Sequence, residues 1–241
     1  MSNHTRRGIH AEVVDALGMR ILGGDLLPGM VLDQDAILDE YGVSRTVLRE
    51  AIKVLTDKGL IDARPRIGTF VTDRPSWRLL DKDVMDWRSR GPIDERLLLE
   101  LDEVRSIIEP AAAAMAADRR SDEELATIRH WMAELDSSHG SLREETIAAD
   151  VAFHRAVLVA AGNELLERFE VILESALHAR DSMLFHDRHE ERRFVGLHQA
   201  VVDAIADQDR DRAARCMTEL MAEADKDVRQ ALADRARAAA S

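Results

Sequence analysis

The sequence predicts a mainly α-helical protein, with a small N-terminal domain that ends in a β-hairpin and a larger C-terminal domain made only of helices. Aromatic residues are 4% of the 241 residues and there are five prolines, whereas hydrophobic residues make up 46%. This balance favours helices over sheets and suffices for a packed core. Apolar residues recur at helical spacing along most of the chain, and only residues 59–71 contain convincing β-prone runs.

The first part of the chain contains a helical segment, a turn and then two shorter helices. Residues 9–23 carry apolar side chains at helical spacing and end at a glycine pair. Residues 34–41 form a second, shorter helix that Gly42 terminates, and Ser44 stands where an N-cap starts a third helix. The spacing predicts that the second and third helices are joined by a tight turn.

The third helix has two contrasting faces. Arg45, Arg49 and Lys53 follow one another at intervals of four residues and lie on one side, whereas apolar residues of the same stretch cover another. A row of basic side chains at this spacing often forms nothing more than a solvated helix face, and that is the alternative to a nucleic-acid contact.

A hairpin follows over residues 59–71, where two β-prone runs flank a basic loop. Two helices around a turn, followed by a hairpin with a basic tip, are the arrangement of a winged helix-turn-helix, which places its last helix in the major groove of DNA. The candidate DNA-binding residues are Ser44, Arg45, Thr46, Arg49, Arg64, Arg66 and Gly68. The arginines of the helix can read guanine, the hydroxyls at its start suit phosphates, and the hairpin tip suits the minor groove.

The chain is predicted to have two domains: residues 1–73 bind DNA, residues 74–92 form a linker, and residues 93–241 form about six helices. Breaks between these helices are expected near Pro92, Ser121, residues 137–141, Gly162-Asn163, Asp187 and Asp209. Residues 1–78 contain 11 Lys and Arg and 11 Asp and Glu, so the whole net charge of −13 lies in the remainder.

Composition also restricts the compartment. Cys216 is the only cysteine, so no internal disulfide can form. The N-terminus lacks the apolar core of a signal peptide, and no run of about 18 apolar residues is present. We expect a cytoplasmic protein without a membrane partner.

The C-terminal domain contains a candidate cluster of polar residues. Asp150 and His154 are four residues apart on one helix face and suit a divalent cation, with His198 as a third candidate ligand. The alternative is that His154 is a hydrogen-bonded core histidine. Arg105 lies beside apolar residues on another helix and requires a partner, which is either Glu109 four residues later or an incoming carboxylate.

The run PGMVL…YGVSRTVLREAIKVLTDKGLIDARPRIGTFV closely resembles the N-terminal domain of the GntR family of bacterial transcription regulators. The helical remainder resembles the FadR-type subgroup, whose FCD ligand-binding domain is an antiparallel helical bundle. The resemblance covers nearly the whole chain. It implies a regulator, not an enzyme, that homodimerises on a palindromic operator, with Arg45, Arg49 and Gly68 at the DNA. One departure is that Gln34-Asp35 stand where the family often has an acidic residue followed by a basic one.

The resemblance also implies a role for the C-terminal cluster. In the FCD signature Asp150, His154 and His198 fall on three of the four positions that bind a divalent metal such as zinc. The fourth position falls at Leu220, which cannot coordinate a metal, so the same polar groups would otherwise hold the ligand directly. Arg105 is implied to anchor an acid, which makes it an effector-binding residue together with these three.

The segment SWRLLDKDVMDW, followed by LDEVRSIIEPAAAAMAA, is most similar to galactonate-responsive repressors of sugar-acid catabolism. The implied effector is therefore an aldonate such as galactonate, with lactate-like acids also open. One alternative is a regulator that senses the metal itself. Another is a metal-dependent hydrolase, for which the sequence offers no glycine-rich phosphate loop, no nucleophile elbow and no paired general acid and base.

Overall fold

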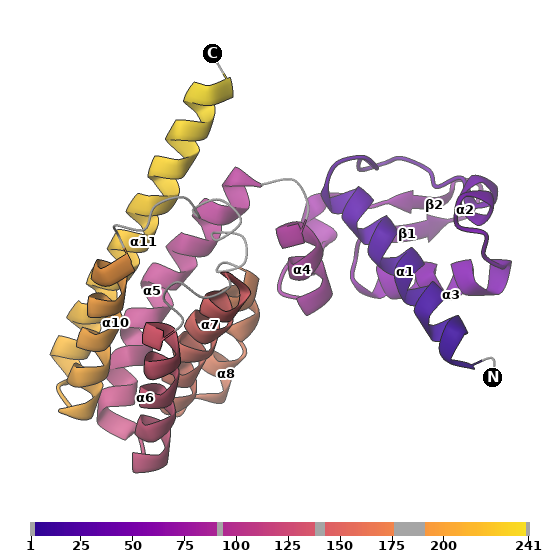
Figure 1. Cartoon of the computed structure of the whole chain (residues 1–241). Helices are drawn as coiled ribbons and strands as arrows, with labels where there is room; N and C mark the ends of the chain where they lie inside the picture. The colour runs from indigo at the N-terminus through magenta and orange to yellow at the C-terminus, as the bar shows by residue number, and fades with distance from the viewer. Residues whose placement is uncertain (1–2, 91–93, 138–142, 176–190, 240–241) are drawn as a thin grey trace. The chain divides into compact units, whose positions relative to one another are not determined.

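The structure, a computed structural model, describes residues 3–90, 94–137, 143–175 and 191–239 (Figure 1). It confirms the mainly α fold with one two-stranded sheet. The chain divides into two compact units, Met1–Ile93 and Asp94–Ser241, which we call the N-terminal unit and the C-terminal unit. Each unit has its own apolar core.

The N-terminal unit consists of helices around a two-stranded hairpin. Its elements are α1 (Asn3–Leu22), α2 (Gln34–Tyr41), α3 (Arg45–Asp57), β1 (Ile61–Arg64), β2 (Gly68–Val71), the 3₁₀ turn η1 (Arg74–Ser76) and α4 (Lys82–Arg90). The predicted bounds of the second helix and the N-cap of the third are confirmed, whereas α1 begins six residues earlier than its apolar pattern predicted.

Local chemistry explains the ends of α2 and α3. The carboxylate of Asp33 accepts the N–H of Ala36 at 3.0 Å and caps α2, which ends where Gly42 adopts a left-handed conformation with φ 60°. The hydroxyl of Ser44 accepts the N–H of Val47 at 3.3 Å and caps α3. These caps fix the turn between the two helices.

The hairpin pairs its strands in an antiparallel register that runs from Ile61 opposite Val71 to Arg64 opposite Gly68. An isolated antiparallel bridge, which the sequence pattern does not predict, joins Val31 to Phe70 of β2.

Residues 74–90 pack on α1 and on the end of α3 within the N-terminal unit. Trp87 of α4 is buried, and its indole N–H donates to Asp15 of α1 at 2.9 Å. The Lys58 ammonium, at the end of α3, pairs with Asp81 at 2.7 Å and Asp83 at 2.6 Å. The described part of the segment that the sequence analysis treated as a linker is therefore folded against α1 and α3.

The C-terminal unit is helical throughout its described residues. Its elements are α5 (Glu95–Arg119), α6 (Asp122–Ser137), α7 (Arg143–Ala160), α8 (Glu164–Glu167), α10 (Glu191–Ala206) and α11 (Arg210–Ala239), and residues 170–175 are also helical. In Figure 1, α5 and α11 run side by side, as do α10 and α11. The breaks expected at Ser121, Gly162-Asn163 and Asp209 are confirmed; those at Pro92, at 138–141 and near Asp187 lie outside the described residues.

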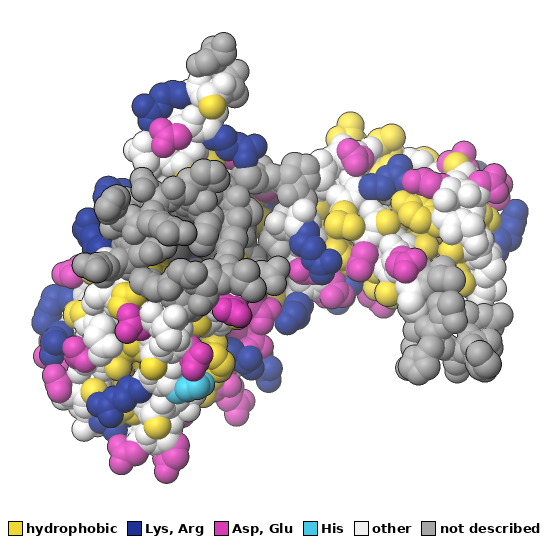
Figure 2. All heavy atoms as spheres, viewed as in Figure 1, with side chains coloured by type: hydrophobic (Ala, Val, Ile, Leu, Met, Phe, Trp, Pro, Cys, Tyr) yellow, Lys and Arg dark blue, Asp and Glu magenta, His cyan; other side chains and the backbone are white. Residues whose placement is uncertain are grey.

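The core of this unit joins five helices. Small side chains of α5, among them Ala113, Ala116 and Ala117, allow neighbouring helices to approach closely. Phe153 of α7 and Leu220 of α11 belong to the same apolar cluster. Within the described ranges, no helix is both long enough and apolar enough to cross a membrane. Figure 2 shows acidic and basic side chains interspersed over the visible surface of these helices.

Candidate functional site

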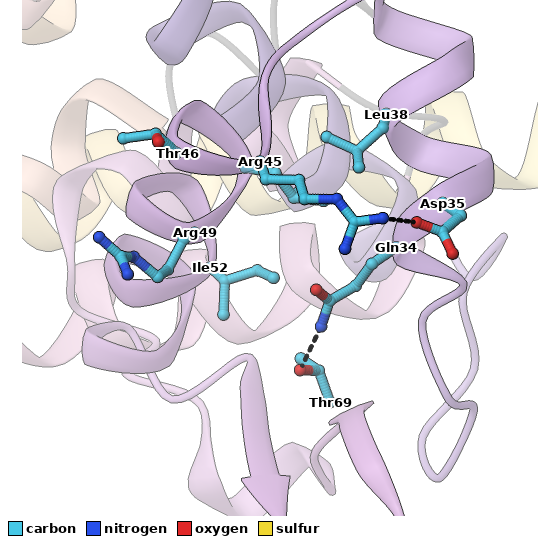
Figure 3. Close-up of a pocket in the computed structure, with 9 residues that line it drawn as sticks. Gln34, Asp35, Leu38, Arg45, Thr46, Arg49, Ile52 and Thr69 are labelled. Atoms are coloured by element: carbon cyan, nitrogen blue, oxygen red, sulfur yellow. Dashed lines mark hydrogen bonds and ion pairs between the residues drawn. The ribbon is translucent and has the colours of Figure 1, made fainter.

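The basic face of α3 is the side opposite its buried residues. Leu48, Ala51 and Leu55 are buried, whereas the side chains of Arg45 and Arg49 are 83% and 71% exposed. In Figure 3 the two guanidinium groups extend from neighbouring turns of the helix. The predicted separation of basic and apolar faces is therefore present in the structure.

A groove of about 350 Å³ lies between α2, α3 and the start of β2 (Figure 3). Gln34 lines it and donates its amide N–H to the hydroxyl of Thr69 at 3.0 Å, which ties α2 to the hairpin. Asp35 also lines it and accepts a hydrogen bond from the Arg45 guanidinium at 3.0 Å. At the two positions where the sequence departs from the pattern of the family it resembles, Gln34 thus bonds to the hairpin and Asp35 bonds to Arg45.

The hairpin tip presents the remaining basic candidates to solvent. Arg64 lies over the ring of Phe70, 4.8 Å from its centroid, which orients its guanidinium by a cation–π contact. Arg66 and Gly68 both have positive φ, 67° and 96°, so the tip turns tightly between the strands. Arg64, Arg66 and Gly68 are exposed and belong to the same unit as the basic face of α3.

The second candidate site is a buried polar cluster in the C-terminal unit. Asp150 and His154 come from consecutive turns of α7, and His198 comes from α10; none is more than 2% exposed. The Nε2 atom of His198 lies 3.1 Å from Asp150 Oδ1 and 3.4 Å from His154 Nε2. Among the described residues, these three form a group whose ligating atoms all lie within 4.8 Å of one another.

The outer nitrogen of each imidazole also has a partner. The Nδ1 atom of His198 lies 2.8 Å from the carbonyl oxygen of Phe194, and because a carbonyl only accepts, Nδ1 carries the proton. The Nδ1 atom of His154 forms an ion pair with Oε2 of Glu109 on α5, although the contact lacks the geometry of a hydrogen bond. Both Nε2 atoms are therefore directed at the carboxylate of Asp150, as in sites where a metal-binding imidazole donates its other N–H to an acceptor. This donor set fits a divalent cation.

Glu109 and Arg105 extend the cluster along α5. The Arg105 Nε donates to Glu109 Oε1 at 2.6 Å, and the two side chains are 1% and 3% exposed. The terminal nitrogens of Arg105, Nη1 and Nη2, are buried and form no hydrogen bond with any residue that the structure describes. A buried guanidinium with unsatisfied donors favours an acceptor such as a carboxylate.

Burial and charge act on these groups in opposite directions. Burial alone would raise the pKa of Glu109, but the charges of Arg105 and His154 outweigh it and lower that pKa to about 2. Burial likewise opposes ionisation of Asp150, yet the hydrogen bond from His154 and the proximity of His198 hold its pKa well below the usual value. Burial lowers the pKa of His198, whereas the carboxylates beside His154 overcome burial and raise its pKa.

The structure brings all four predicted effector-binding residues into one region through direct contacts and one intermediary. That intermediary is Glu109, whose spacing in the sequence predicts only a structural pairing with Arg105. A structural pairing with Glu109 and an incoming carboxylate are both compatible with the geometry of Arg105. Glu109 occupies Nε, and the two terminal nitrogens remain without a hydrogen bond among the described residues. Leu220, at the fourth expected ligand position, is buried in the apolar cluster and supplies no donor.

Comparison with known proteins identifies both halves of the chain. Residues 9–71 match the gntR family of bacterial regulatory proteins, and residues 100–223 match the FCD domain. The galactonate operon transcriptional repressor of Escherichia coli (strain K12) is 31% identical over 221 residues, which cover 91% of this chain and 96% of that protein. An uncharacterized HTH-type transcriptional regulator of the same strain, YieP, is 33% identical over 223 residues, covering 92% and 96%.

A solved structure has a similar fold. The structure of Lar, described as controlling expression of the Listeria monocytogenes agr system, has a TM-score of 0.66 over 92% of this chain and 96% of its own. At 21% sequence identity, this likeness shows the fold alone.

Proposed function

Because the chain belongs to the GntR family of bacterial transcriptional regulators and carries an FCD domain, we propose that it is a repressor whose operator is released when a small carboxylate binds the C-terminal unit. Members of this family are regulators and not enzymes. The observation that carries the proposal is the buried guanidinium of Arg105, whose two terminal nitrogens lack a partner among the described residues.

DNA reading is assigned to the exposed faces of α3 and the hairpin. Arg45 and Arg49 enter the major groove and pair with guanine, and Ser44 and Thr46 approach phosphates at the start of the same helix. The wing residues Arg64, Arg66 and Gly68 enter the adjacent minor groove. The chain acts as a cytoplasmic homodimer, so that two recognition helices meet the two halves of a palindrome.

Effector binding is assigned to Arg105 and to the cluster of Asp150, His154 and His198. These last three residues would hold a divalent cation, which would supply a positive charge for the carboxylate and hydroxyl oxygens of a hydroxy acid. Arg105 would pair with the carboxylate through its two terminal nitrogens. A sugar acid meets both requirements, and the relative named for the galactonate operon supports an aldonate.

The test is fluorescence anisotropy of a labelled fragment from upstream of the protein's own gene, first with protein alone and then with galactonate, gluconate and lactate. We expect tight DNA binding that one of these acids reverses. An acid that binds preferentially to the conformation with low operator affinity shifts the population of the protein towards that conformation. Operator affinity that stays unchanged at saturating acid would contradict effector release.

Two variants separate the roles of the two units. Arg105→Met should bind the fragment as the wild type does but no longer respond to the acid, since methionine keeps the apolar stem and lacks the donors. Arg49→Ala should bind the fragment more weakly, whereas the acid should still shift the thermal unfolding of this variant. A response in Arg105→Met equal to that of the wild type would remove Arg105 from the effector site.

A second candidate function is metal sensing, which the convergence of three ligating atoms favours. The two functions differ in what changes DNA affinity when no acid is present. Removing divalent cations with a chelator and restoring zinc, while operator binding is followed, would alter affinity only if the cation is itself the signal.

A further inference from the structure

We propose that Glu109 is a positioning residue that couples metal occupancy to acid binding, because its two carboxylate oxygens hold Arg105 and His154 at the same time. This inference rests on the proposed function and specifies how that site is regulated. The two halves of the site lie on different helices, since Arg105 is on α5 whereas Asp150 and His154 are on α7. Glu109 contacts both halves.

Each oxygen of Glu109 has its own partner. Oε1 accepts the Nε–H of Arg105 at 2.6 Å, and Oε2 forms an ion pair with Nδ1 of His154 that lacks the geometry of a hydrogen bond. The carboxylate is 3% exposed, so neither contact is exchanged easily for water. A rotation of the carboxylate that suits one partner therefore changes its geometry toward the other.

The contact with Arg105 determines which of its nitrogens are available. Glu109 occupies Nε and leaves Nη1 and Nη2, the pair that suits a planar carboxylate in a bidentate arrangement. Without Glu109, the guanidinium would lose the hydrogen bond at Nε, and its buried charge would keep only the electrostatic effect of Asp150 and Asp102.

The contact with His154 determines which nitrogen faces the cluster. With Nδ1 directed at Glu109, the Nε2 atom lies 3.4 Å from Asp150 Oδ1 and from His198 Nε2. An imidazole held by a carboxylate on its outer nitrogen is oriented and made more basic as a ligand. Glu109 therefore prepares the acid anchor and the cation ligand through a single group.

A purely structural role for Glu109 makes a different prediction. The chain contains a matched pair for comparison, because Arg96 and Glu100 also stand four residues apart on α5, with the same Nε-to-carboxylate distance of 2.6 Å. That pair is exposed, with side chains 74% and 41% accessible. If Glu109 only fixed an arginine on the helix, its removal would lower stability without changing how zinc and an acid affect one another.

The experiment measures Zn²⁺ and galactonate binding by calorimetry on full-length wild type, Glu109→Gln and Glu100→Gln. In the wild type, bound zinc should tighten galactonate by roughly 5-fold or more, a typical allosteric coupling. Glu109→Gln should weaken zinc affinity by roughly 10–100-fold, as is usual when a residue that orients a metal ligand is lost. In this variant the ratio of galactonate affinities with and without zinc should fall close to 1. Glu100→Gln should match the wild type in both respects.

A second variant keeps the test valid if Glu109→Gln fails to fold, which circular dichroism will show. Arg105→Met leaves every proposed metal ligand intact, yet it should also weaken zinc several-fold because it releases the carboxylate that holds His154. Unchanged zinc affinity in Arg105→Met overturns the coupling, since a residue without a link to the cluster would have no effect there.

The outcomes also separate this inference from the proposed function. If the wild type binds neither zinc nor galactonate, the proposed effector site is wrong and the inference fails with it. If the wild type binds both, and Glu109→Gln retains the wild-type zinc affinity or the wild-type effect of zinc on galactonate, the inference alone is overturned. Zinc binding to the wild type that leaves galactonate binding unaffected overturns the coupling as well.

Discussion

Arg45 and Arg49 occupy equivalent positions on successive turns of α3 but have different neighbours. Arg45 is held by Asp35 at 3.0 Å, whereas the nearest acid to Arg49 is Glu50 at 3.8 Å. Exposed ion pairs of this kind add little to stability, so both guanidinium groups can exchange their partners for DNA. We therefore expect separate effects when each residue, or its acidic neighbour, is changed.

Arg49→Ala should weaken operator binding by about 1–3 kcal/mol, or roughly 5–150-fold, because a bidentate contact with guanine contributes this much discrimination. Anisotropy at fixed salt, on the operator and on unrelated DNA, measures the change. Arg229→Ala, which removes an exposed arginine from α11, is the control and should bind as the wild type does. An equal loss on both DNAs would mean that Arg49 contacts phosphate instead of a base.

Asp35→Asn should lower the ratio of operator affinity to affinity for unrelated DNA. Its carboxylate orients the guanidinium of Arg45, and it also repels phosphates, so the amide should bind unrelated DNA more tightly and the operator less selectively. Asp39→Asn removes an exposed charge from the same helix and serves as the control. A ratio equal to that of the wild type would show that Asp35 does not contribute to selectivity.

At this scale, the sequence predicted residues within one element better than contacts between elements. The exposure of Arg45 and the cap at Ser44 follow from helical periodicity and from local hydrogen bonding. The contact between Glu109 and His154 joins α5 to α7 across 45 positions. Residue spacing within a helix cannot predict such a contact, because the contact depends on how the two helices pack.

Among the elements, α4 shows how a segment without a strong pattern can still be well packed. Gly18 of α1 faces the ring of Trp87, and a Cβ at this position would overlap the ring. Lys58 also lies 5.6 Å from the centroid of the same ring. The short length of α4 and its polar composition concealed this contact from the sequence analysis, which depends on apolar periodicity.

Gly18→Ala should destabilise the N-terminal unit by about 1–3 kcal/mol, the usual cost of forcing extra volume into a packed contact. Chemical unfolding followed by tryptophan fluorescence measures it. The matched control is Gly8→Ala in the same helix, where a Cβ would have nothing within 4 Å and where alanine should be neutral or slightly stabilising. Equal stability of the two variants would show that α4 does not pack on α1 in solution.

The hairpin was predictable in type but not in full. Its two runs and basic tip are local features, and the paired strands confirm them. The bridge between Val31 and Phe70 joins the turn before α2 to β2, and a single pair of residues leaves no recognisable pattern in a sequence. The bounds of α1 were also missed, because apolar spacing detects a buried face and not the end of a helix.

For the whole molecule, the distribution of charge is the principal feature. The residues up to Arg78 carry equal numbers of acidic and basic side chains, so all 13 net negative charges lie in the rest of the chain. An acidic molecule gains little from nonspecific electrostatic attraction to DNA. Its operator affinity should therefore depend on specific contacts at two half-sites.

A duplex with one intact half-site should therefore bind roughly 100-fold or more weakly than the complete palindrome, since the second contact of a homodimer is intramolecular. Anisotropy on the two duplexes measures this ratio, and analytical ultracentrifugation on each gives the stoichiometry. Equal affinity for both, with one chain per duplex, would contradict the homodimer.

The packing of α4 on α1 also determines where regulators of this kind can be recombined. Val84 and Trp87 share one apolar cluster with Val13, Leu17 and Leu55, so α4 belongs to the folding unit that reads DNA. A chimaera joined after the hairpin would separate Trp87 from Asp15 and expose the α1 surface that α4 covers. A joint between residues 93 and 94 leaves both cores intact. At this position an effector domain can be exchanged without disrupting the DNA-binding unit.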